Sequence, residues 1–225
     1  MQIVDPYIQV EKINGIQIMK NIERACRTCY RSEGKITEES YKTLLKNCIT
    51  RGHESVLEHE KVTIRLYCDL GVYKDLTRHR IASFSIESTR YCNYGKDKFD
   101  NELKIIKPCN IEEGTDIYAN WKNACEAIEK NYMEMSKKGA LPDQLRMILP
   151  HSIATEVTMT ANIREWKHIL SLRASNHTHP SIRQLMIPLL LYFKQIMPEI
   201  FEDVPYDVEF PKEKYAKLSQ TEDIY

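Results

Sequence analysis

The chain of 225 residues contains no apolar run near the roughly 20 residues that a membrane-spanning helix requires. Its first residues, MQIVDPYIQVEKI, include an early acid and lack the apolar core of a secretory signal. We therefore expect a cytoplasmic protein that does not associate with a membrane. No Pro/Gly/Ser-rich linker or low-complexity tract divides the sequence, which predicts a single domain over residues 1–225.

The sequence also lacks a surplus of either charge, because 32 basic side chains are balanced by 32 acidic ones. Domains that bind nucleic acid usually carry a marked positive surplus, so the composition argues against DNA or RNA as a partner. Neither GxGxxG nor GxxxxGK[ST] occurs. A nucleotide ligand would therefore not be held by a Rossmann or Walker loop.

Seven cysteines form an odd set in a chain without an export signal, so free thiols are expected. Cys26 and Cys29 make one CxxC, but no second pair and no histidines at ligand spacing follow it. We expect no metal site. A structural role for these thiols is favoured over redox chemistry, which the sequence leaves open.

The hydrophobic periodicity predicts helices and strands in blocks, without a repeated strand-helix unit. Strands are expected at Lys61–Cys68 and Ile153–Ala161, where apolar and polar residues alternate. The expected helices are 18–30, a second one capped by Thr37, a short one at 71–80, one at 116–138 between Thr115 and Gly139, one at 163–174, and one from Pro180 that bends or breaks near Pro188. This order favours an α+β fold with a central, mainly antiparallel sheet flanked by helices.

The segment RHRIASFSIESTRY, residues 78–91, concentrates arginines and serines. Arginine offers a rigid fork of charged donors, and serine hydroxyls add short neutral donors, which together suit phosphate or pyrophosphate. We expect the serines on a loop after the short helix. A solvated basic face or a weak nucleic-acid patch is the alternative interpretation. The neutral composition favours a small polyanionic ligand over DNA or RNA.

Arginine is absent from residues 91–145, and Arg146, Arg164, Arg173 and Arg183 follow. These side chains could converge with the arginines of the 78–91 segment on one cleft. They could instead pair locally, as Arg146 with Asp143 or Arg164 with Glu165. The sequence does not choose between the two arrangements.

Arg78, His79, Arg80, Ser83, Ser88 and Arg90 together read RHRxxSxxxxSxR. This pattern resembles the signature of the flavin-dependent thymidylate synthases. Four further segments are similar to that family in the expected order: RGHESVLEHEKVTIRL at 51–66, DQLRMILP at 143–150, TANIREWKHILSLR at 160–173 and HTHPSIRQLM at 177–186.

The resemblance implies reductive methylation of dUMP to dTMP, with methylenetetrahydrofolate as carbon donor, NADPH as reductant and FAD as hydride carrier. It also implies a homotetramer whose active sites lie where subunits meet. A non-catalytic nucleotide- or RNA-binding module is the alternative.

The resemblance also implies roles for individual residues. Arg173 is the expected catalytic residue, because an enzyme without a thiolate on C6 must stabilise negative charge on the pyrimidine ring. The expected flavin contacts are His53, Ser55, Arg78, His79, Arg80, Asn162, Arg164 and His168. The expected dUMP contacts are Asp75, Arg78, Glu87, Ser88, Thr89, Arg90, Arg146 and Arg173, with the phosphate among Ser88, Arg90 and Arg146.

The chain departs from the family pattern at several positions. Ser85-Ile86 stands where many members have Asn-Glu, so Glu87 would have to supply the acidic contact. Asp75 replaces a glutamine, and His168 replaces an asparagine of some members. Ser88 is not a convincing nucleophile because no base accompanies it.

Cys92 is a second nucleophile to weigh, because its thiol follows the motif directly. The nearby arginines could activate a thiolate or bind a substrate, and the resemblance supports only the substrate.

Overall fold

Five strands form the main sheet of the structure, a computed structural model that describes residues 1–221. The strand order is β4-β6-β3-β2-β7. All neighbours are antiparallel except β2 and β7, which are parallel. The strands are β2 (Tyr7–Glu11), β3 (Lys61–Asp69), β4 (Ala82–Ile86), β6 (Ala154–Asn162) and β7 (Lys217–Thr221). The expected mainly antiparallel sheet is confirmed.

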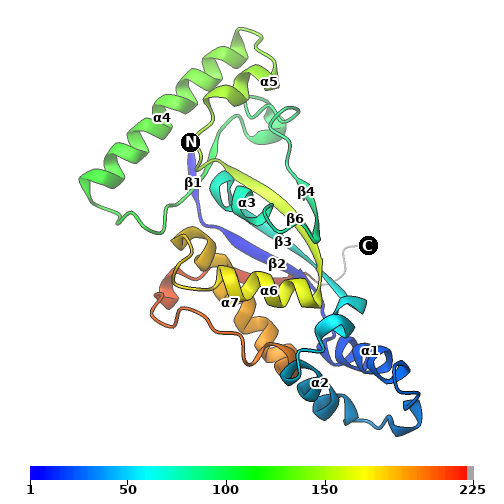
Figure 1. The fold of residues 1–225 in the computed structure, drawn as a ribbon. Coiled ribbons are helices and arrows are strands. Elements are labelled where there is room, and N and C mark those ends of the chain that lie inside the picture. The colour runs from blue at the N-terminus through cyan, green and yellow to red at the C-terminus, as the bar shows by residue number, and fades with distance from the viewer. Residues whose placement is uncertain (222–225) are drawn as a thin grey trace.

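One face of this sheet is buried under helices. Along β3, Val62, Ile64, Leu66 and Cys68 are all at most 5% exposed, as the alternation in the sequence predicted. Helices α6 and α7 lie against this face, while α4 and α5 project from one end of the molecule and α1 and α2 from the other (Figure 1). The sheet is therefore covered by helices on one side.

The helices agree with the predicted ones at most positions. They are α1 (Gly15–Thr28), α2 (Ser40–Thr50), α3 (Leu70–Leu76), α4 (Asp116–Lys137), α5 (Pro142–Leu145), α6 (Ile163–Arg173), α7 (Pro180–Ile196) and α8 (Pro198–Phe201). α7 runs through Pro188 without a break, so of the expected bend or break the break is wrong. The buried residues on both sides of Pro188, including Ile187 and Leu189, hold the helix against the core.

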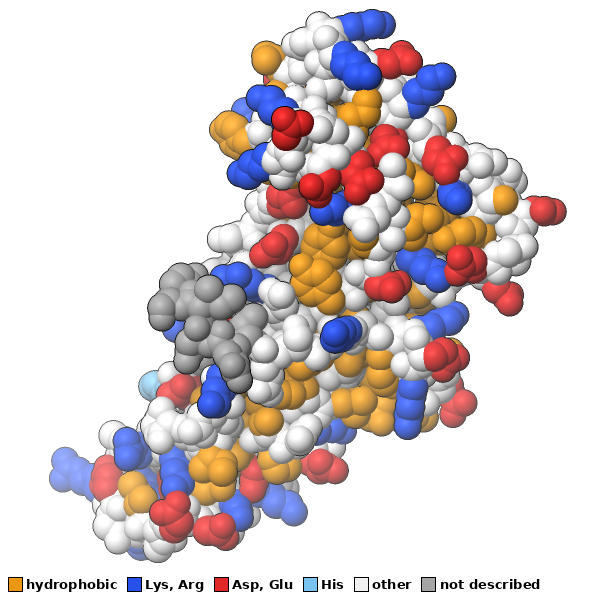
Figure 2. Space-filling view, turned by 180° about the vertical axis from the view of Figure 1, so that it is seen from behind, with side chains coloured by type: hydrophobic (Ala, Val, Ile, Leu, Met, Phe, Trp, Pro, Cys, Tyr) orange, Lys and Arg blue, Asp and Glu red, His pale blue; other side chains and the backbone are white. Residues whose placement is uncertain are grey.

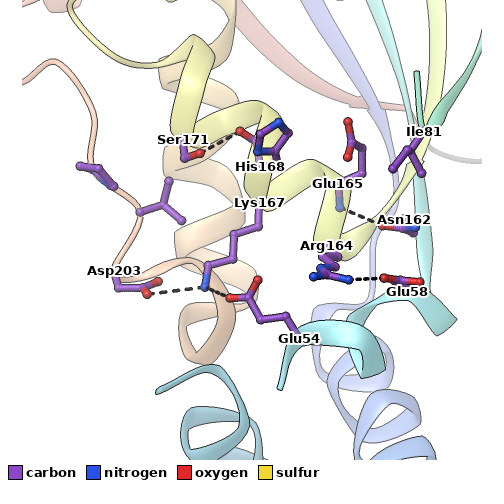
Figure 3. A pocket seen from close by; sticks show the side chains of 12 residues that line it. Glu54, Glu58, Ile81, Asn162, Arg164, Glu165, Lys167, His168, Ser171 and Asp203 are labelled. Atoms are coloured by element: carbon purple, nitrogen blue, oxygen red, sulfur yellow. Dashed lines mark hydrogen bonds and ion pairs between the residues drawn. The ribbon is translucent and has the colours of Figure 1, made fainter. Parts of the chain in front are cut away.

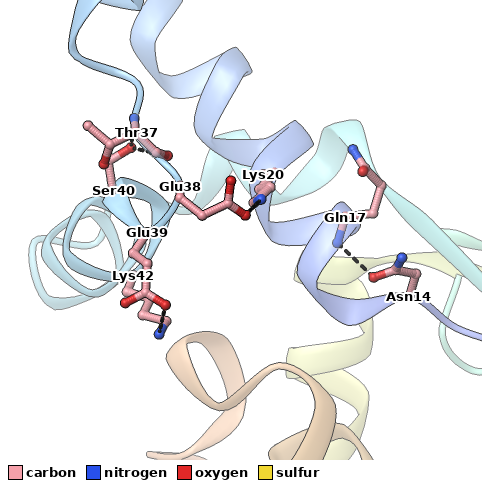
Figure 4. A network of polar contacts seen from close by, with 8 residues as sticks. All are labelled: Asn14, Gln17, Lys20, Thr37, Glu38, Glu39, Ser40 and Lys42. Carbon is pink, nitrogen blue, oxygen red and sulfur yellow. Dashed lines mark hydrogen bonds and ion pairs between the residues drawn. The ribbon is translucent and has the colours of Figure 1, made fainter.

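Thr37 does not cap α2, contrary to the prediction. The helix begins at Ser40, and the hydroxyl of Ser40 accepts a hydrogen bond from the Thr37 backbone N–H at 2.9 Å (Figure 4). The connection is tied to α1 by an ion pair between Lys20 and Glu38. The turn before α2 is thus stabilised by Ser40, and Thr37 lies outside the helix.

The expected loop position of the serines is also wrong in part. α3 ends at Leu76, and Ser83 and Ser85 lie on β4, which pairs with β6 from Ala82 to Ile86. Only Ser88 lies in the turn that follows β4. Ser83 and Ser85 are the exposed residues of this paired edge strand. Because serine is also common in loops, the alternation of β4 was mistaken for a loop sequence.

A second, smaller cluster of buried residues lies around α4. Tyr132 of α4 belongs to it, together with Tyr94, Leu103 and Leu145 from other segments. A two-stranded parallel sheet of β1 (Gln2–Val4) and β5 (Lys104–Ile106) joins this part to the chain start. Thr115 caps α4 and Gly139 follows it at φ 85°, as predicted. That the whole chain forms one domain stays a prediction.

The cysteines are free thiols. Cys26 lies against Cys48 with 3.1 Å between the Sγ atoms, whereas Cys29 is exposed. The CxxC spacing therefore does not describe the closest thiol pair. Within residues 1–221 no helix is both long and apolar enough to cross a bilayer.

Replacing Ile64 by alanine is expected to lower the free energy of unfolding by about 2–5 kcal/mol, because this residue is fully buried on the central strand β3. Urea unfolding monitored by circular dichroism measures the change. The control is Lys61→Ala on the same strand, whose side chain is exposed and should change stability by less than about 0.5 kcal/mol. Equal effects of the two substitutions would contradict the burial pattern.

Candidate active site

Helix α6 divides its residues between the core and a cavity. Ile163, Trp166, Ile169 and Leu170 are fully buried, and the Trp166 indole N–H donates to the Val62 carbonyl of β3 at 3.0 Å. Asn162 caps the helix by accepting from the Glu165 backbone N–H at 2.8 Å. A second stripe, Arg164, Lys167, His168 and Ser171, has the spacing of one helix face and lines the cavity.

The cavity measures about 470 Å³ and is bordered by α6, the segment before β3 and the chain after α8. Lys167 Nζ lies 2.8 Å from Glu54 and 3.5 Å from Asp203, and Arg164 pairs with Glu58 at 2.5 Å (Figure 3). The short 3-10 helix η2 (Glu54–His59) supplies both glutamates. His53 and Ser55, at the start of η2, are exposed. The cavity wall is therefore charged and internally paired.

Arg173, the last residue of α6, is held by two acceptors from the other side of the site. Its Nε donates to His79 Nε2 at 3.0 Å, and its Nη2 donates to the Asp75 backbone carbonyl at 2.8 Å. No carboxylate within residues 1–221 forms an ion pair with Arg173. No carboxylate thus offsets the charge of the guanidinium, while its two hydrogen bonds fix its orientation.

His79 is buried, at 6% exposure, between α6 and the end of α3. Its Nδ1 lies 3.6 Å from Glu165 Oε1, and its ring meets that of His168 edge to face at 5.9 Å. Burial, together with the charges of Arg173 and His168, lowers the pKa of His79 to about 4. The ring is therefore neutral at pH 7 and accepts through Nε2.

Arg78 and Arg80 follow α3 and are exposed. Neither side chain has an acidic partner among residues 1–221. Unpaired, exposed arginines of this kind are suited to bind an anion, and Ile81, the next residue along the chain, lines the cavity.

A second cationic group lies beyond the far end of β4. The Glu87 backbone N–H extends the pairing by donating to Glu156 at 3.0 Å, and the Glu87 carboxylate accepts from the Tyr94 hydroxyl at 2.9 Å. Ser88 and Arg90 follow in a turn, with Arg90 over the Tyr91 ring at 5.9 Å. Thr89, between them, is half-buried.

Arg146 begins the short helix η4 (Arg146–Ile148), next to Leu145 of the second cluster. Its side chain is exposed and, like that of Arg90, has no acidic partner in the described part of the chain. Arg146 therefore does not pair with Asp143, and Arg164 pairs with Glu58 rather than with Glu165.

Strand β4 separates these two groups. It has five residues, which at roughly 3.3 Å each span about 16 Å. The first group contains Arg78, His79, Arg80, Asn162, Arg164, His168 and Arg173, together with Asp75 and the nearby His53 and Ser55. The second contains Glu87, Ser88, Thr89 and Arg90, with Arg146 on the same side. Within one chain the residues expected to bind dUMP are thus divided.

Several side chains that line the cavity were not among the site residues expected from the sequence. Glu54, Glu58, Lys167 and Asp203 form the ion pairs of its wall. Lys167 could have been found by extending the helical spacing from Arg164 and His168, whereas Asp203 gives no local signal. Arg183 does not join the site, because it pairs with Asp207 and stacks on Phe210 at 5.0 Å.

Cys92 is poorly suited to act as a nucleophile. Burial and the neighbouring Glu87 raise the pKa of its thiol, which disfavours the thiolate. In the described residues no three His, Cys, Asp or Glu side chains gather in a way that could hold a metal ion.

A family model and the sequences of known proteins match most of this chain. Residues 16–199 match the family model described as thymidylate synthase complementing protein. The flavin-dependent thymidylate synthase of Pyrococcus abyssi is 32% identical over 157 residues, which cover 69% of this chain and 64% of that protein. That of Mycolicibacterium gilvum is 30% identical over 200 residues, covering 81% and 78%. The match to the Pyrococcus protein thus spans less than two thirds of its length.

Two solved structures have a similar fold. The UMP/dUMP methylase PolB from Streptomyces cacaoi, bound with 5-Br dUMP, superimposes with a TM-score of 0.73 at 20% identity and covers 90% of this chain and 96% of its own. The flavin-dependent thymidylate synthase ThyX from Helicobacter pylori, complexed with FAD and dUMP, gives a TM-score of 0.69 at 21% identity, covering 88% and 99%. The expected α+β fold is confirmed.

The buried, neutral His79 predicts a pH dependence of stability. Below the ordinary pKa of about 6.5 the unfolded chain binds a proton that the folded chain does not bind until about pH 4, so this residue destabilises the fold as the pH falls through that range. Between pH 7 and pH 5 the wild type should lose about 1–2 kcal/mol more unfolding free energy than His79→Gln. Urea unfolding at both pH values tests this, and a constant difference between the two proteins would contradict it.

Proposed function

The chain belongs to the flavin-dependent thymidylate synthase family, and on this premise we propose that it catalyses the reductive methylation of dUMP to dTMP. FAD is the proposed cofactor, with NADPH and 5,10-methylenetetrahydrofolate as co-substrates. The observation that carries the proposal is Arg173, a fully charged guanidinium held in place by two neutral acceptors. Its neighbours on α6, His168 and Ser171, line the cavity.

The residues around the cavity fit a flavin dinucleotide. The cavity of about 470 Å³ lies in the range of small-molecule sites. Arg78 and Arg80 have no acidic partner in residues 1–221, so their donors suit a pyrophosphate. Asn162 uses its side-chain oxygen as the helix cap and keeps its amide donors for a ligand. We propose that these residues, with Arg164, His168, His53 and Ser55, hold the cofactor.

We propose that the phosphate of dUMP binds among Ser88, Arg90 and Arg146. The three side chains offer one hydroxyl and two guanidinium groups without acidic partners. Glu87 is less available than expected, because its carboxylate already accepts from Tyr94. Asp75 accepts a hydrogen bond from Arg173 through its backbone carbonyl. This role does not involve its carboxylate, so it does not require a negative charge beside the phosphate.

The chemistry requires electron density at C5 of the pyrimidine. Arg173 would increase this density by favouring the ionised ring, since a fixed positive charge stabilises negative charge at N3 and O4 without giving up a proton. Of its five N–H donors two are used by His79 and Asp75, so three remain for the substrate. The bound flavin would supply the hydride, which no side chain can provide. Thr89 and the remaining contacts would orient the nucleotide.

A second copy of the chain is proposed to complete each site. Strand β4, about 16 Å long, lies between the two cationic groups, and we propose that Arg173 and the Ser88–Arg90 turn meet at one dUMP by coming from different copies. Exposed apolar residues, Ile81, Tyr91 and Met147, accompany both groups. On the side of the sheet away from α6, Tyr7 and Tyr67 stack at 4.8 Å, and apolar side chains gather along the middle of that view (Figure 2). The proposed assembly is a homotetramer.

The proposal is tested by one spectrum and one assay. The purified protein should show flavin absorbance, bind dUMP, oxidise NADPH only when dUMP is present, and form dTMP only with methylenetetrahydrofolate. A colourless protein that takes up no FAD and oxidises no NADPH would overturn it. Binding of oligonucleotides with a steep salt dependence and no redox activity would support a non-catalytic binding module instead.

Arg173→Ala is expected to lower kcat by roughly 100- to 1000-fold while leaving bound FAD unchanged, because its proposed task is to stabilise charge on the pyrimidine. FAD content is measured by absorbance after release, and turnover by dTMP formation. Arg24→Ala, an exposed arginine on α1, is the control and should retain full activity. Loss of FAD together with activity would place Arg173 at the cofactor instead.

A further inference from the structure

His79 stands between the helix that carries Arg173 and the end of α3. Its Nε2 accepts from Arg173 Nε at 3.0 Å, and its Nδ1 lies 3.6 Å from Glu165 Oε1. Both ring nitrogens thus face protein groups, and the ring is 6% exposed. The three side chains form a line from Glu165 through His79 to Arg173.

The direction of the hydrogen bonds fixes the state of the ring. A guanidinium can only donate, so His79 Nε2 must carry a lone pair and the proton must lie on Nδ1. That proton faces the Glu165 carboxylate, which favours this tautomer. Burial lowers the pKa of His79, so the neutral ring persists at neutral pH.

A neutral acceptor has an advantage over a carboxylate at this position. An aspartate or glutamate would orient Arg173 equally well, but its charge would offset that of the guanidinium. The histidine and the Asp75 carbonyl hold two N–H groups of Arg173 without neutralising it. The arginine keeps its charge for a developing anion on the substrate, and its plane is set before the substrate binds.

We propose that His79 is a positioning residue that fixes the orientation of Arg173 through a neutral hydrogen bond, with Glu165 holding the ring. This role rests on the proposed function of Arg173. It differs from the flavin contact that the resemblance implies for His79, because Nε2 accepts from Arg173 and Nδ1 faces Glu165, both residues of α6.

The test compares His79→Leu, which fills the space but accepts no hydrogen bond, with His79→Gln, whose amide oxygen can accept from Arg173. Ile169→Val makes a small change in the buried face of the same helix. It is the control for weakened packing of α6 against the core and should keep wild-type kcat. Each protein is measured for FAD per chain, KM for dUMP and kcat.

We expect His79→Leu to retain FAD, to lower kcat roughly 10- to 100-fold, and to change KM for dUMP less than about threefold. His79→Gln should recover kcat to within about fivefold of wild type. Such a rescue would not follow from a structural role alone, because leucine fills the space of the His79 side chain at least as well as glutamine does.

Three results would overturn the role. Unchanged kcat in His79→Leu would show that Arg173 needs no such anchor, and loss of FAD from both variants would make His79 a cofactor ligand. A wild type without dUMP-dependent turnover would remove the proposed function and this role with it, whereas the first two results leave the function standing. If His79→Leu does not fold, Glu165→Leu is measured in its place. It is expected to retain FAD and to lower kcat by less than His79→Leu would. Unchanged kcat or loss of FAD would again contradict the role.

Discussion

The antiparallel pairing of β4 with β6 is the constraint on which the rest of the site depends. From Ala82 to Ile86 the edge strand is fixed against β6, and the Glu87 N–H extends that pairing by one more bond. Helix α6 follows β6 directly, and Arg173 at its last position donates to His79, which precedes β4, so Arg173 and the cavity lie at one end of β4. The turn with Ser88 and Arg90 lies at the other end. One segment of sequence thereby carries two cationic groups that a strand separates.

This separation gives the two groups different tasks in the proposed reaction. The end near α6 combines a charged cavity wall with an arginine that is oriented by neutral acceptors, an arrangement suited to stabilise charge as it develops. The far end offers exposed arginines and a hydroxyl, which suit a phosphate that keeps its charge throughout. A nucleotide that reaches both groups would bridge two copies of the chain, and binding would then depend on assembly.

The sequence predicted those elements whose periodicity is strong. The alternation of Lys61–Cys68 and the cap at Thr115 both appear in the structure, because local pattern and tertiary packing agree there. Strand β4 was missed because its outward serines resemble a loop, and α7 continues through Pro188 because the surrounding core holds it. The motif residues were found in the sequence. Their division between the two ends of β4 was not, because the sequence alone did not show that an extended strand lies between them. Asp203 and the anchoring of Arg173 by His79 depend on contacts between distant segments, which one sequence does not contain.

The central claim is that each site draws Arg173 from one copy and Arg90 from another. The most direct measurement is co-expression of equal amounts of an Arg173→Ala chain and an Arg90→Ala chain, each inactive alone, followed by an assay of dTMP formation. If the two groups come from different copies, random assembly restores both in roughly a quarter of the sites, and about that fraction of wild-type activity should return. If both groups served the same site from a single chain, no mixed assembly would contain an intact site. Mixed oligomers that form normally but show no activity would contradict the account.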